Sequence, residues 1–441
     1  MARRIAILGA SMGGMVAAAE LRKQGCDVTV FEKARGVGGL YSKVETPFGN
    51  QELGMHVLYV DGRHYAHLCD IFGRDSFHVM RGPRVDVGAS ANFGGVYWGS
   101  HYPSLLGHPL RERVLGEILQ SPTAGELGSN AHEEALRRFG YTAAHEVFLP
   151  ILRKLWAREP CELSSHALHC FFDLRRIVVV GKDEADRLKD NPELDAVIAN
   201  PVQSRPKGTV FDGRMALVFR EGYCDPSDRA IEWAERSSVT LRFGSDVSVA
   251  EGSLCADGVE LNRDFDACLV ALPSHALAGP LATDADKAEL SIYYCQLEKP
   301  LADQFPAYYI LAHDPSLITS RIVNYDGYRP RSEGKGRSVL GIESVHPPGK
   351  APAPDTIAAE VLRMLPDACV AGTFQLPRSL PVPVPSLANG WRLDAFEQSI
   401  AGAFGKPVYF TGMRTDTGVF FSHHTIGLAY DSTLALLRRL A

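Results

Sequence analysis

The start of the chain carries the pattern that most restricts what it can fold into. A short apolar run at residues 5–8 ends at Gly9, and a segment rich in Ala, Met and Leu follows at residues 13–23. A second apolar run covers residues 27–31, and Glu32 stands directly after it. Short apolar runs bounded by turn signals are typical of buried parallel strands. The pattern therefore predicts a strand, a helix and a second strand, the unit from which parallel α/β sheets are built.

The turn between the first strand and the helix has the character of a dinucleotide-binding turn. It reads Gly9-Ala10-Ser11-Met12-Gly13-Gly14, whereas the dinucleotide fingerprint has glycine at its first, third and sixth places. Ser11 holds the middle place, where the backbone approaches a pyrophosphate, and its small side chain weakens the match without abolishing it. Amides at the helix start can bind phosphate, and Glu32 can accept hydrogen bonds from ribose hydroxyls. We expect a dinucleotide site; the alternative is an ordinary strand–helix turn that binds nothing.

The residues after Glu32 indicate which dinucleotide is bound. Lys33 is followed by Arg35-Gly36-Val37-Gly38-Gly39 and then by Leu40. This stretch resembles the second glycine patch of the FAD-binding superfamily that includes amine oxidases, protoporphyrinogen oxidases, phytoene desaturases and UDP-galactopyranose mutases. The resemblance implies non-covalently bound FAD in an α/β fold, with a Rossmann-type (glutathione-reductase-like) FAD-binding domain and an inserted mixed α+β substrate domain. In this part of the chain it assigns to the cofactor Gly9, Ser11, Met12, Gly13, Gly14, Glu32, Lys33, Arg35, Gly38, Gly39 and Leu40.

Later segments resemble further FAD elements of the same superfamily. Val247 falls where a backbone valine meets the adenine, and a buried strand near the C-terminus ends at Gly412. The last helix is expected to open at Thr425 and Ile426, with its N-terminus against the flavin N1–C2 edge. Most members carry an acid soon after the glycine, but this chain has Arg414, as the mutases do. An arginine there suits a flavin or a substrate that carries negative charge.

The resemblance and the apolar patterning together predict two domains. The FAD-binding domain is placed at residues 1–75, 205–280 and 385–441, and the substrate domain at residues 76–204 and 281–384. Helical spacing of apolar residues predicts helices in the first inserted segment, at residues 110–119, 130–139 and 143–156. Runs of β-branched and aromatic residues predict strands in the second, at residues 292–294, 308–311 and 339–342. A hairpin is expected at residues 253–262, with Asp257-Gly258 as its turn.

Four residues are candidates for catalysis. His56 ends a Gly-x-His segment that the resemblance places beside the isoalloxazine ring, although a histidine held by main-chain bonds is the alternative. Trp156 lies in a stretch that resembles the mutases' Lys-x-Trp segment, and it could wall a substrate pocket or pack in a core. Arg321, with Tyr325 near it, suits an anionic or sugar-phosphate ligand, or else it is a surface charge. Arg414 is the fourth candidate.

Other sequence features narrow the chemistry. His423-His424 precede the last helix and are read as loop residues near the flavin that could carry protons; no metal site is expected, because the spacing of partner ligands is missing. The net charge of −6 argues against nucleic-acid binding. The nine cysteines include no Cys-x-x-Cys pair, which favours a reducing, cytoplasmic setting. No apolar run reaches the ~18 residues of a membrane span.

The predicted function follows from the cofactor. We expect an FAD-dependent oxidoreductase, similar to amine oxidases and protoporphyrinogen oxidases, that moves a hydride from a small organic substrate to flavin N5. One alternative is a mutase-like isomerase that uses reduced flavin on a sugar nucleotide without net redox change. A flavin-binding protein without turnover is a third. The sequence leaves open the identity of the substrate, the electron acceptor and whether the chain forms a homodimer.

Overall fold

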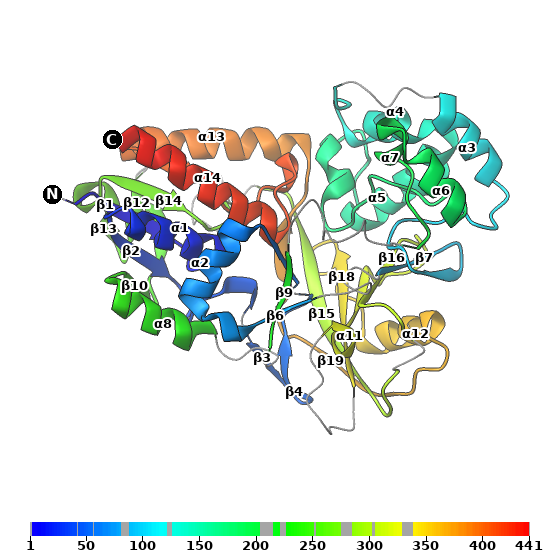
Figure 1. Cartoon of the computed structure of the whole chain (residues 1–441), viewed down its shortest axis with the longest axis horizontal. Coiled ribbons are helices and arrows are strands. Elements are labelled where there is room, and N and C mark those ends of the chain that lie inside the picture. The colour runs from blue at the N-terminus through cyan, green and yellow to red at the C-terminus, as the bar shows by residue number, and fades with distance from the viewer. Residues whose placement is uncertain are drawn as a thin grey trace.

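The structure is a computed structural model of the chain with three visible parts (Figure 1). A layered α/β part holds both ends of the chain, a large sheet lies beside it, and a group of helices covers one end of that sheet. The residues that the structure describes are 2–41, 43–55, 57–80, 88–120, 126–202, 215–220, 226–250, 253–274, 285–301, 305–328 and 338–440.

The layered part is built on a five-stranded parallel sheet, in the order β10-β2-β1-β14-β21. Its strands come from distant parts of the chain: β1 (Arg4–Leu8), β2 (Asp27–Glu32), β10 (Thr240–Phe243), β14 (Ala267–Val270) and β21 (Val408–Phe410). β1 and β14 are almost entirely buried, and three of the six residues of β2 are buried, as expected for a parallel sheet covered on both faces. The predicted α/β class with a Rossmann-type domain is confirmed.

Helices cover both faces of this sheet. Ile5 and Ile7 point into a core shared with one group of helices, whereas Ala6 and Leu8 point to the opposite face. The first face is covered by α1 (Met12–Lys23), α2 (Gly62–Phe72), α8 (Pro226–Ser237) and α14 (Ser422–Leu440). The second face is covered by α13 (Leu387–Phe404), by α9 (Leu261–Asp264) and by the strands β11 (Val247–Ala250), β12 (Ser253–Ala256) and β13 (Val259–Glu260).

The hairpin of β12 and β13 forms where the sequence predicts it. Asp257 and Gly258 make its two-residue turn, with φ angles of 52° and 77°. Two positive φ angles are the requirement of a type I′ turn, which the Asp-Gly pair meets. Two smaller sheets lie between the layered part and the large sheet: β3 (Lys43–Thr46) with β4 (Gly49–Glu52), and β5 (Leu58–Val60) with β9 (Met215–Phe219) and β6 (Phe77–Val79).

The large sheet has eight strands and is mainly antiparallel, in the order β19-β15-β18-β17-β16-β7-β8, with β20 also pairing with β15. α12 (Pro354–Met364) packs on one face. The three predicted strand runs fall within this sheet. Its members are β7 (Gly88–Asn92), β8 (Gly95–Trp98), β15 (Lys287–Leu297), β16 (Tyr309–Ala312), β17 (Arg321–Asn324), β18 (Val339–His346), β19 (Val370–Gln375) and β20 (Leu380–Pro383).

The helical group has its own apolar core. Phe139 stacks on Phe148 with ring centroids 3.8 Å apart, and Trp156 is buried close by. The three predicted helices are present, although Gly140 (φ 76°) kinks the second and a π-helical turn leads into the third. The elements are α3 (Arg111–Gln120), α4 (Ala131–Ala143), the π turn Ala144–Phe148, α5 (Leu149–Trp156), the 3₁₀ turn Ser165–His169, α6 (Lys182–Leu188) and α7 (Pro192–Asp195).

Within the described ranges, no helix combines the length and the apolarity that crossing a membrane requires. The exact boundaries of the two predicted domains stay a prediction, and residues 205–214 of the proposed FAD domain lie outside the described residues.

Candidate functional site

The turn between β1 and α1 forms a cradle of backbone amides. Ser11 is the N-cap of α1, and its Oγ accepts a hydrogen bond from the Gly14 amide at 3.2 Å. A Cβ at Gly14 would stand 2.2 Å from the Gly9 carbonyl oxygen, so that only glycine fits there. Met12 and Gly13 are the first residues of α1, so their amides have no carbonyl partner within the helix. Amides in this position can bind phosphate oxygens at the positive end of the helix.

The second glycine patch lies against this turn. The Gly38 amide donates to the Ala10 carbonyl at 2.8 Å, and the Val37 amide donates to Ser227 Oγ at 2.9 Å. A Cβ at Gly39 would lie 3.9 Å from Cα and Cβ of Ser11. The two loops therefore lie side by side, and a side chain at position 39 would contact Ser11. Lys33, Arg35 and Leu40, in and after the second glycine patch, are exposed.

Glu32 lies at the end of β2, where a ribose would be bound. Its Oε2 accepts from the Ala10 amide and its Oε1 from the Ala34 amide, both at 2.8 Å. Each carboxylate oxygen keeps a second lone pair for a ribose hydroxyl. The Ser245 amide donates to the Glu32 carbonyl at 3.0 Å, which brings the segment before β11 and Val247 to the same end of the sheet.

The C-terminal segment lies next to the start of α1. A Cβ at Gly412 would stand 1.9 Å from the Leu272 carbonyl oxygen, so the backbone approaches β14 as closely as glycine allows. α14 begins at Ser422, three residues before the predicted start at Thr425, and Tyr41 donates to Ser422 Oγ at 2.8 Å. Gly13 faces the Thr425 carbonyl, so the starts of α1 and α14 are adjacent. The side chain of Ile426 is fully buried.

These residues fit FAD. The first amides of α1, the two adjacent glycine loops and the acceptor Glu32 suit the adenosine and the pyrophosphate. The start of α14 offers partial positive charge to an anionic ring edge. The fit rests on Gly14 and Gly412, where a Cβ would collide with backbone carbonyls.

Arg414 is held by carboxylates of the chain itself. It is 8% exposed, and it donates from Nε to Asp416 at 2.9 Å and from Nη2 to Asp394 at 2.9 Å, while Nη1 lies 3.1 Å from Glu397. Burial lowers the pKa of Arg414, but Asp416 and Glu397 raise it above its usual range. In the structure the charge of Arg414 thus has three carboxylate partners from the chain itself, and its predicted contact with a flavin or a substrate stays a prediction.

Arg321 also has a carboxylate partner. Its Nη2 lies 2.8 Å from Oε1 and 2.6 Å from Oε2 of Glu343, and its guanidinium lies 5.2 Å from the Phe171 ring centroid. Glu343 Oε1 also accepts from the Met55 amide at 3.2 Å. Arg321 therefore stands where the large sheet, the helical group and the segment before position 56 meet. His56 itself lies outside the described residues, as does the side chain of Tyr328.

Trp156 lies in the core of the helical group. It is 1% exposed, and Nε1 has no hydrogen-bond partner among the described residues. On the same helix, Lys154 Nζ donates to the carbonyls of Ala312, Asp314 and Thr319. This part of the Lys-x-Trp segment thus lies in α5, and Lys154 joins the helix to the β16–β17 connection.

Histidines gather at the start of α14. The ring centroids of His423 and His424 are 4.1 Å apart, and those of His424 and His169 are 5.4 Å apart. Burial, together with the charge of Arg175, lowers the pKa of His169 to about 4, so its imidazole is neutral near pH 7. Phe421 lies beside both His169 and His424. Sequence reasoning missed His169, because nothing in its local pattern marks it as a neighbour of α14.

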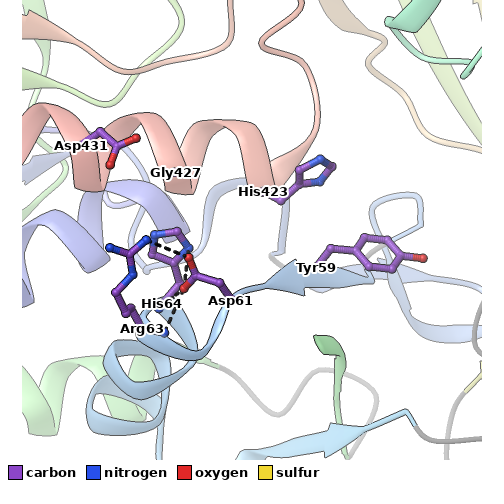
Figure 2. A pocket seen from close by; sticks show the side chains of 7 residues that line it. All are labelled: Tyr59, Asp61, Arg63, His64, His423, Gly427 and Asp431. Carbon is purple, nitrogen blue, oxygen red and sulfur yellow. Dashed lines mark hydrogen bonds and ion pairs between the residues drawn. The ribbon is translucent and has the colours of Figure 1, made fainter. Parts of the chain in front are cut away.

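A polar cleft of about 190 Å³ opens beside these histidines. In Figure 2, Arg63 and His64 project from the start of α2 toward α14. His64 Nδ1 lies 3.3 Å from Asp61, the N-cap of α2. No group of three or more metal-ligand side chains occurs among the residues that the structure describes. The cleft is lined by Tyr59, Asp61, Arg63, His64, His423, Gly427 and Asp431.

The chain resembles known proteins in two ways. Its sequence resembles theirs over short stretches only, whereas its fold resembles theirs over the whole length. A family model described as an NAD(P)-binding Rossmann-like domain matches residues 7–74. A zeta-carotene-forming phytoene desaturase of Myxococcus xanthus is 46% identical over 56 residues, which are 13% of this chain and 11% of that protein. The chain thus matches only about a tenth of the length of this relative.

Solved structures resemble the chain over its full length. A reduced UDP-galactopyranose mutase matches 100% of this chain and 96% of its own, with a TM-score of 0.68 and 15% identity. A putrescine oxidase with a redesigned cofactor site matches 100% of this chain and 99% of its own, with a TM-score of 0.61 and 14% identity. FAD is the cofactor of this fold, as predicted. At these identities the likeness concerns the fold, which the chain shares with a UDP-galactopyranose mutase and a putrescine oxidase.

Proposed function

We propose that the chain is an FAD-dependent oxidoreductase that moves a hydride from a small organic substrate to flavin N5. The choice of this reaction rests on one observation: both candidate arginines are paired with carboxylates. Arg414 is held by Asp416, Asp394 and Glu397, and Arg321 by Glu343. A sugar nucleotide carries a diphosphate, which such arginines would have to neutralise from a free position.

Aromatic side chains lie between Arg321 and the start of α14. Phe171 is 3% exposed, its ring lies 6.0 Å from that of Phe420, and Phe420 lies 5.2 Å from Phe421. His169, which burial keeps neutral, adds a hydrogen-bonding group to these rings. Aromatic rings with one hydrogen-bonding group suit a substrate whose reacting carbon is uncharged and lies next to one polar group.

In this proposal each part of the chain has a defined task. Bound FAD supplies the hydride-accepting atom. Glu32 binds the ribose, the amides of Met12 and Gly13 bind phosphate, and the start of α14 faces the ring edge. Phe171 and Phe421 keep water from the substrate, and His169 accepts a hydrogen bond from the substrate's polar group.

The mutase-like alternative has the fold in its favour, but the two arginines that favoured it are paired with carboxylates. The likeness to UDP-galactopyranose mutase concerns the fold, at 15% identity. The features that favoured this reaction in the sequence include Arg321 and Arg414, and both are engaged in ion pairs. A flavin-binding protein without turnover is the third possibility, and the same experiment separates all three.

The test begins with the purified protein. We expect a flavin absorption spectrum and the release of FAD on heating, and the Glu32→Ala variant serves as the FAD-depleted control. Under anaerobic conditions, small amines, alcohols and unsaturated hydrocarbons are then added, and bleaching of the oxidised flavin by one class supports the proposal. Conversion of UDP-galactopyranose by dithionite-reduced protein, with no bleaching by any class, would establish the mutase reading instead.

A further inference from the structure

Three buried side chains from distant parts of the chain form hydrogen bonds with the backbone of residues 52–55. Tyr294 donates its hydroxyl to the Glu52 carbonyl at 2.5 Å. Tyr325 donates to the Gly54 carbonyl at 3.2 Å, and Glu343 accepts from the Met55 amide at 3.2 Å. The partners are separated by 242, 271 and 288 positions in the sequence. We call Tyr294, Tyr325, Glu343 and Arg321 the backbone clamp.

The clamp is buried and electrically balanced. Tyr294 is 0%, Tyr325 is 2% and Glu343 is 1% exposed. A buried carboxylate is costly unless it is paired and hydrogen-bonded. Arg321 pairs with Glu343, and Phe171 covers the guanidinium. The clamp therefore reaches from the large sheet to the helical group on one side and to residues 52–55 on the other.

Two glycines show how closely the clamp is fitted. Gly54 has a φ of 97°, and a Cβ there would stand 2.7 Å from Glu343 Oε1. A Cβ at Gly341, beside Glu343 on β18, would stand 2.2 Å from the Tyr325 hydroxyl. Side chains at either position would push the clamp off the backbone that it holds, so residues 52–55 have one fixed path.

We propose that the backbone clamp positions the protein segment at the flavin edge and so makes FAD binding depend on the large sheet. The proposal rests on the proposed use of FAD, because the resemblance places the segment that ends at position 56 beside the isoalloxazine ring. Tyr294, Tyr325, Glu343 and Arg321 are positioning residues that touch neither the substrate nor the flavin. The role of Arg321 is then to pair with Glu343 and hold its carboxylate in place.

β15 offers a matched pair of variants for the test. Tyr293 and Tyr294 are adjacent and both 0% exposed, and each donates its hydroxyl to a backbone carbonyl. Tyr294 reaches Glu52 at 2.5 Å, whereas Tyr293 reaches Pro352 at 2.7 Å, away from the segment. Both changes to phenylalanine keep the ring and remove one buried hydroxyl, so their effects on folding should be similar.

The measurements are the dissociation constant of FAD, from quenching of flavin fluorescence, and the absorption spectrum of bound flavin. We expect Tyr294→Phe to weaken FAD binding by about tenfold, the equivalent of one lost hydrogen bond, and to shift the flavin bands. Tyr293→Phe should leave both unchanged. Equal changes in the two variants, or no change in Tyr294→Phe, would overturn the proposal.

A second pair tests the charged part of the clamp. Glu343→Gln keeps an acceptor for the Met55 amide but leaves Arg321 unpaired. Its control is Glu134→Gln in α4, since Glu134 is also 1% exposed, accepts from the Gly128 amide and binds Arg138. Only Glu343→Gln should weaken FAD binding. If the wild-type protein binds FAD but oxidises no substrate, the proposed reaction is refuted. The clamp is then still tested by the FAD affinities of these variants.

Discussion

Arg321 and Arg414 show why the role of a charged residue is hard to read from sequence. Both stand in segments that resemble flavoenzyme motifs, and both were predicted to meet anions. In the structure Arg321 meets Glu343, and Arg414 meets Asp416 and two further carboxylates. Glu32 and the glycines can be predicted to lie close together because they belong to one short unit. The sequence cannot predict partners such as Tyr294 for Glu52, 242 positions apart.

Glu32 gives the first prediction at the residue scale. Changing Glu32→Gln removes the charge and turns one acceptor oxygen into a donor that faces a backbone amide. Hydrogen bonds to charged groups contribute about 1.5–3 kcal/mol, so we expect FAD affinity to fall by one to two orders of magnitude. Isothermal titration with FAD measures this. Glu260→Gln, at an ion pair with Arg263 on the β12–β13 hairpin, is the control and should bind FAD normally.

Gly412 and Gly427 form a second test at this scale. Gly412→Ala places a Cβ 1.9 Å from the Leu272 carbonyl oxygen, whereas a Cβ at Gly427 has nothing within 4 Å. Forcing an atom into a packed site costs about 1–3 kcal/mol, while Gly to Ala inside a helix gains about 0.5–1 kcal/mol. Thermal unfolding should show Gly412→Ala melting lower and Gly427→Ala melting at or above the wild-type temperature. The reverse order would contradict the close approach at Gly412.

His169 predicts a pH dependence. The folded protein holds the pKa of His169 at about 4, whereas a histidine in an unfolded chain titrates near 6.5. The unfolded state therefore binds more protons between these pH values, and the stability that neutral His169 contributes is present above pH 6.5 and lost as the pH falls to 4. In His169→Gln, the proton uptake on unfolding near pH 5 should fall by about one. Denaturant unfolding from pH 4 to pH 7 tests this; an unchanged pH slope would count against it.

At the scale of elements, the apolar pattern predicts the helices and strands but not their irregular joints. The last helix starts at Ser422, earlier than predicted, because its first turn carries histidines and no apolar signal. The kink at Gly140 and the π turn that follows depend on packing, since Glu117 fills the space beside Gly140. Such joints decide where His169 and α5 lie, and no local pattern predicts them.

Lys154 supplies a prediction for α5. Its Nζ holds the carbonyls of Ala312, Asp314 and Thr319, which join α5 to the β16–β17 connection. Lys154→Met keeps the apolar stem but leaves these buried acceptors without a donor, which costs about 1–3 kcal/mol for each group that water cannot reach. Urea unfolding should show a loss of at least about 2 kcal/mol. Lys182→Met, at an exposed pair with Asp186, should change stability little.

At the scale of the molecule, the sequence predicts the Rossmann-type part far better than the inserted part. The strand–turn–helix unit is a local pattern with a fixed geometry, and it also carries the match to known families at residues 7–74. The inserted sheet takes β7 and β8 from one segment and β15 to β20 from another. Their pairing depends on contacts between segments that have no shared local pattern, so the substrate wall could not be predicted.

Cofactor removal gives the prediction for the whole molecule. A ligand that binds only the native state adds about 2.7 kcal/mol at a hundredfold excess over its dissociation constant. We therefore expect FAD to raise the melting temperature of the apoprotein by a few degrees, while NADP⁺, whose 2′-phosphate Glu32 repels, has no effect. Differential scanning fluorimetry with each nucleotide measures this. Equal stabilisation by both would contradict the assignment of Glu32.

The sheet order has a consequence for how the protein is made. β21 and α14 complete a sheet that begins with β1, and Tyr41 finds Ser422 across 381 positions. While the chain is being synthesised, β14 has an open edge until β21 emerges, and open edges favour wrong pairing between chains. β1 therefore waits for residues more than 400 positions later before its sheet is complete, and the start of α14 can meet the start of α1 only after residue 425 has been made.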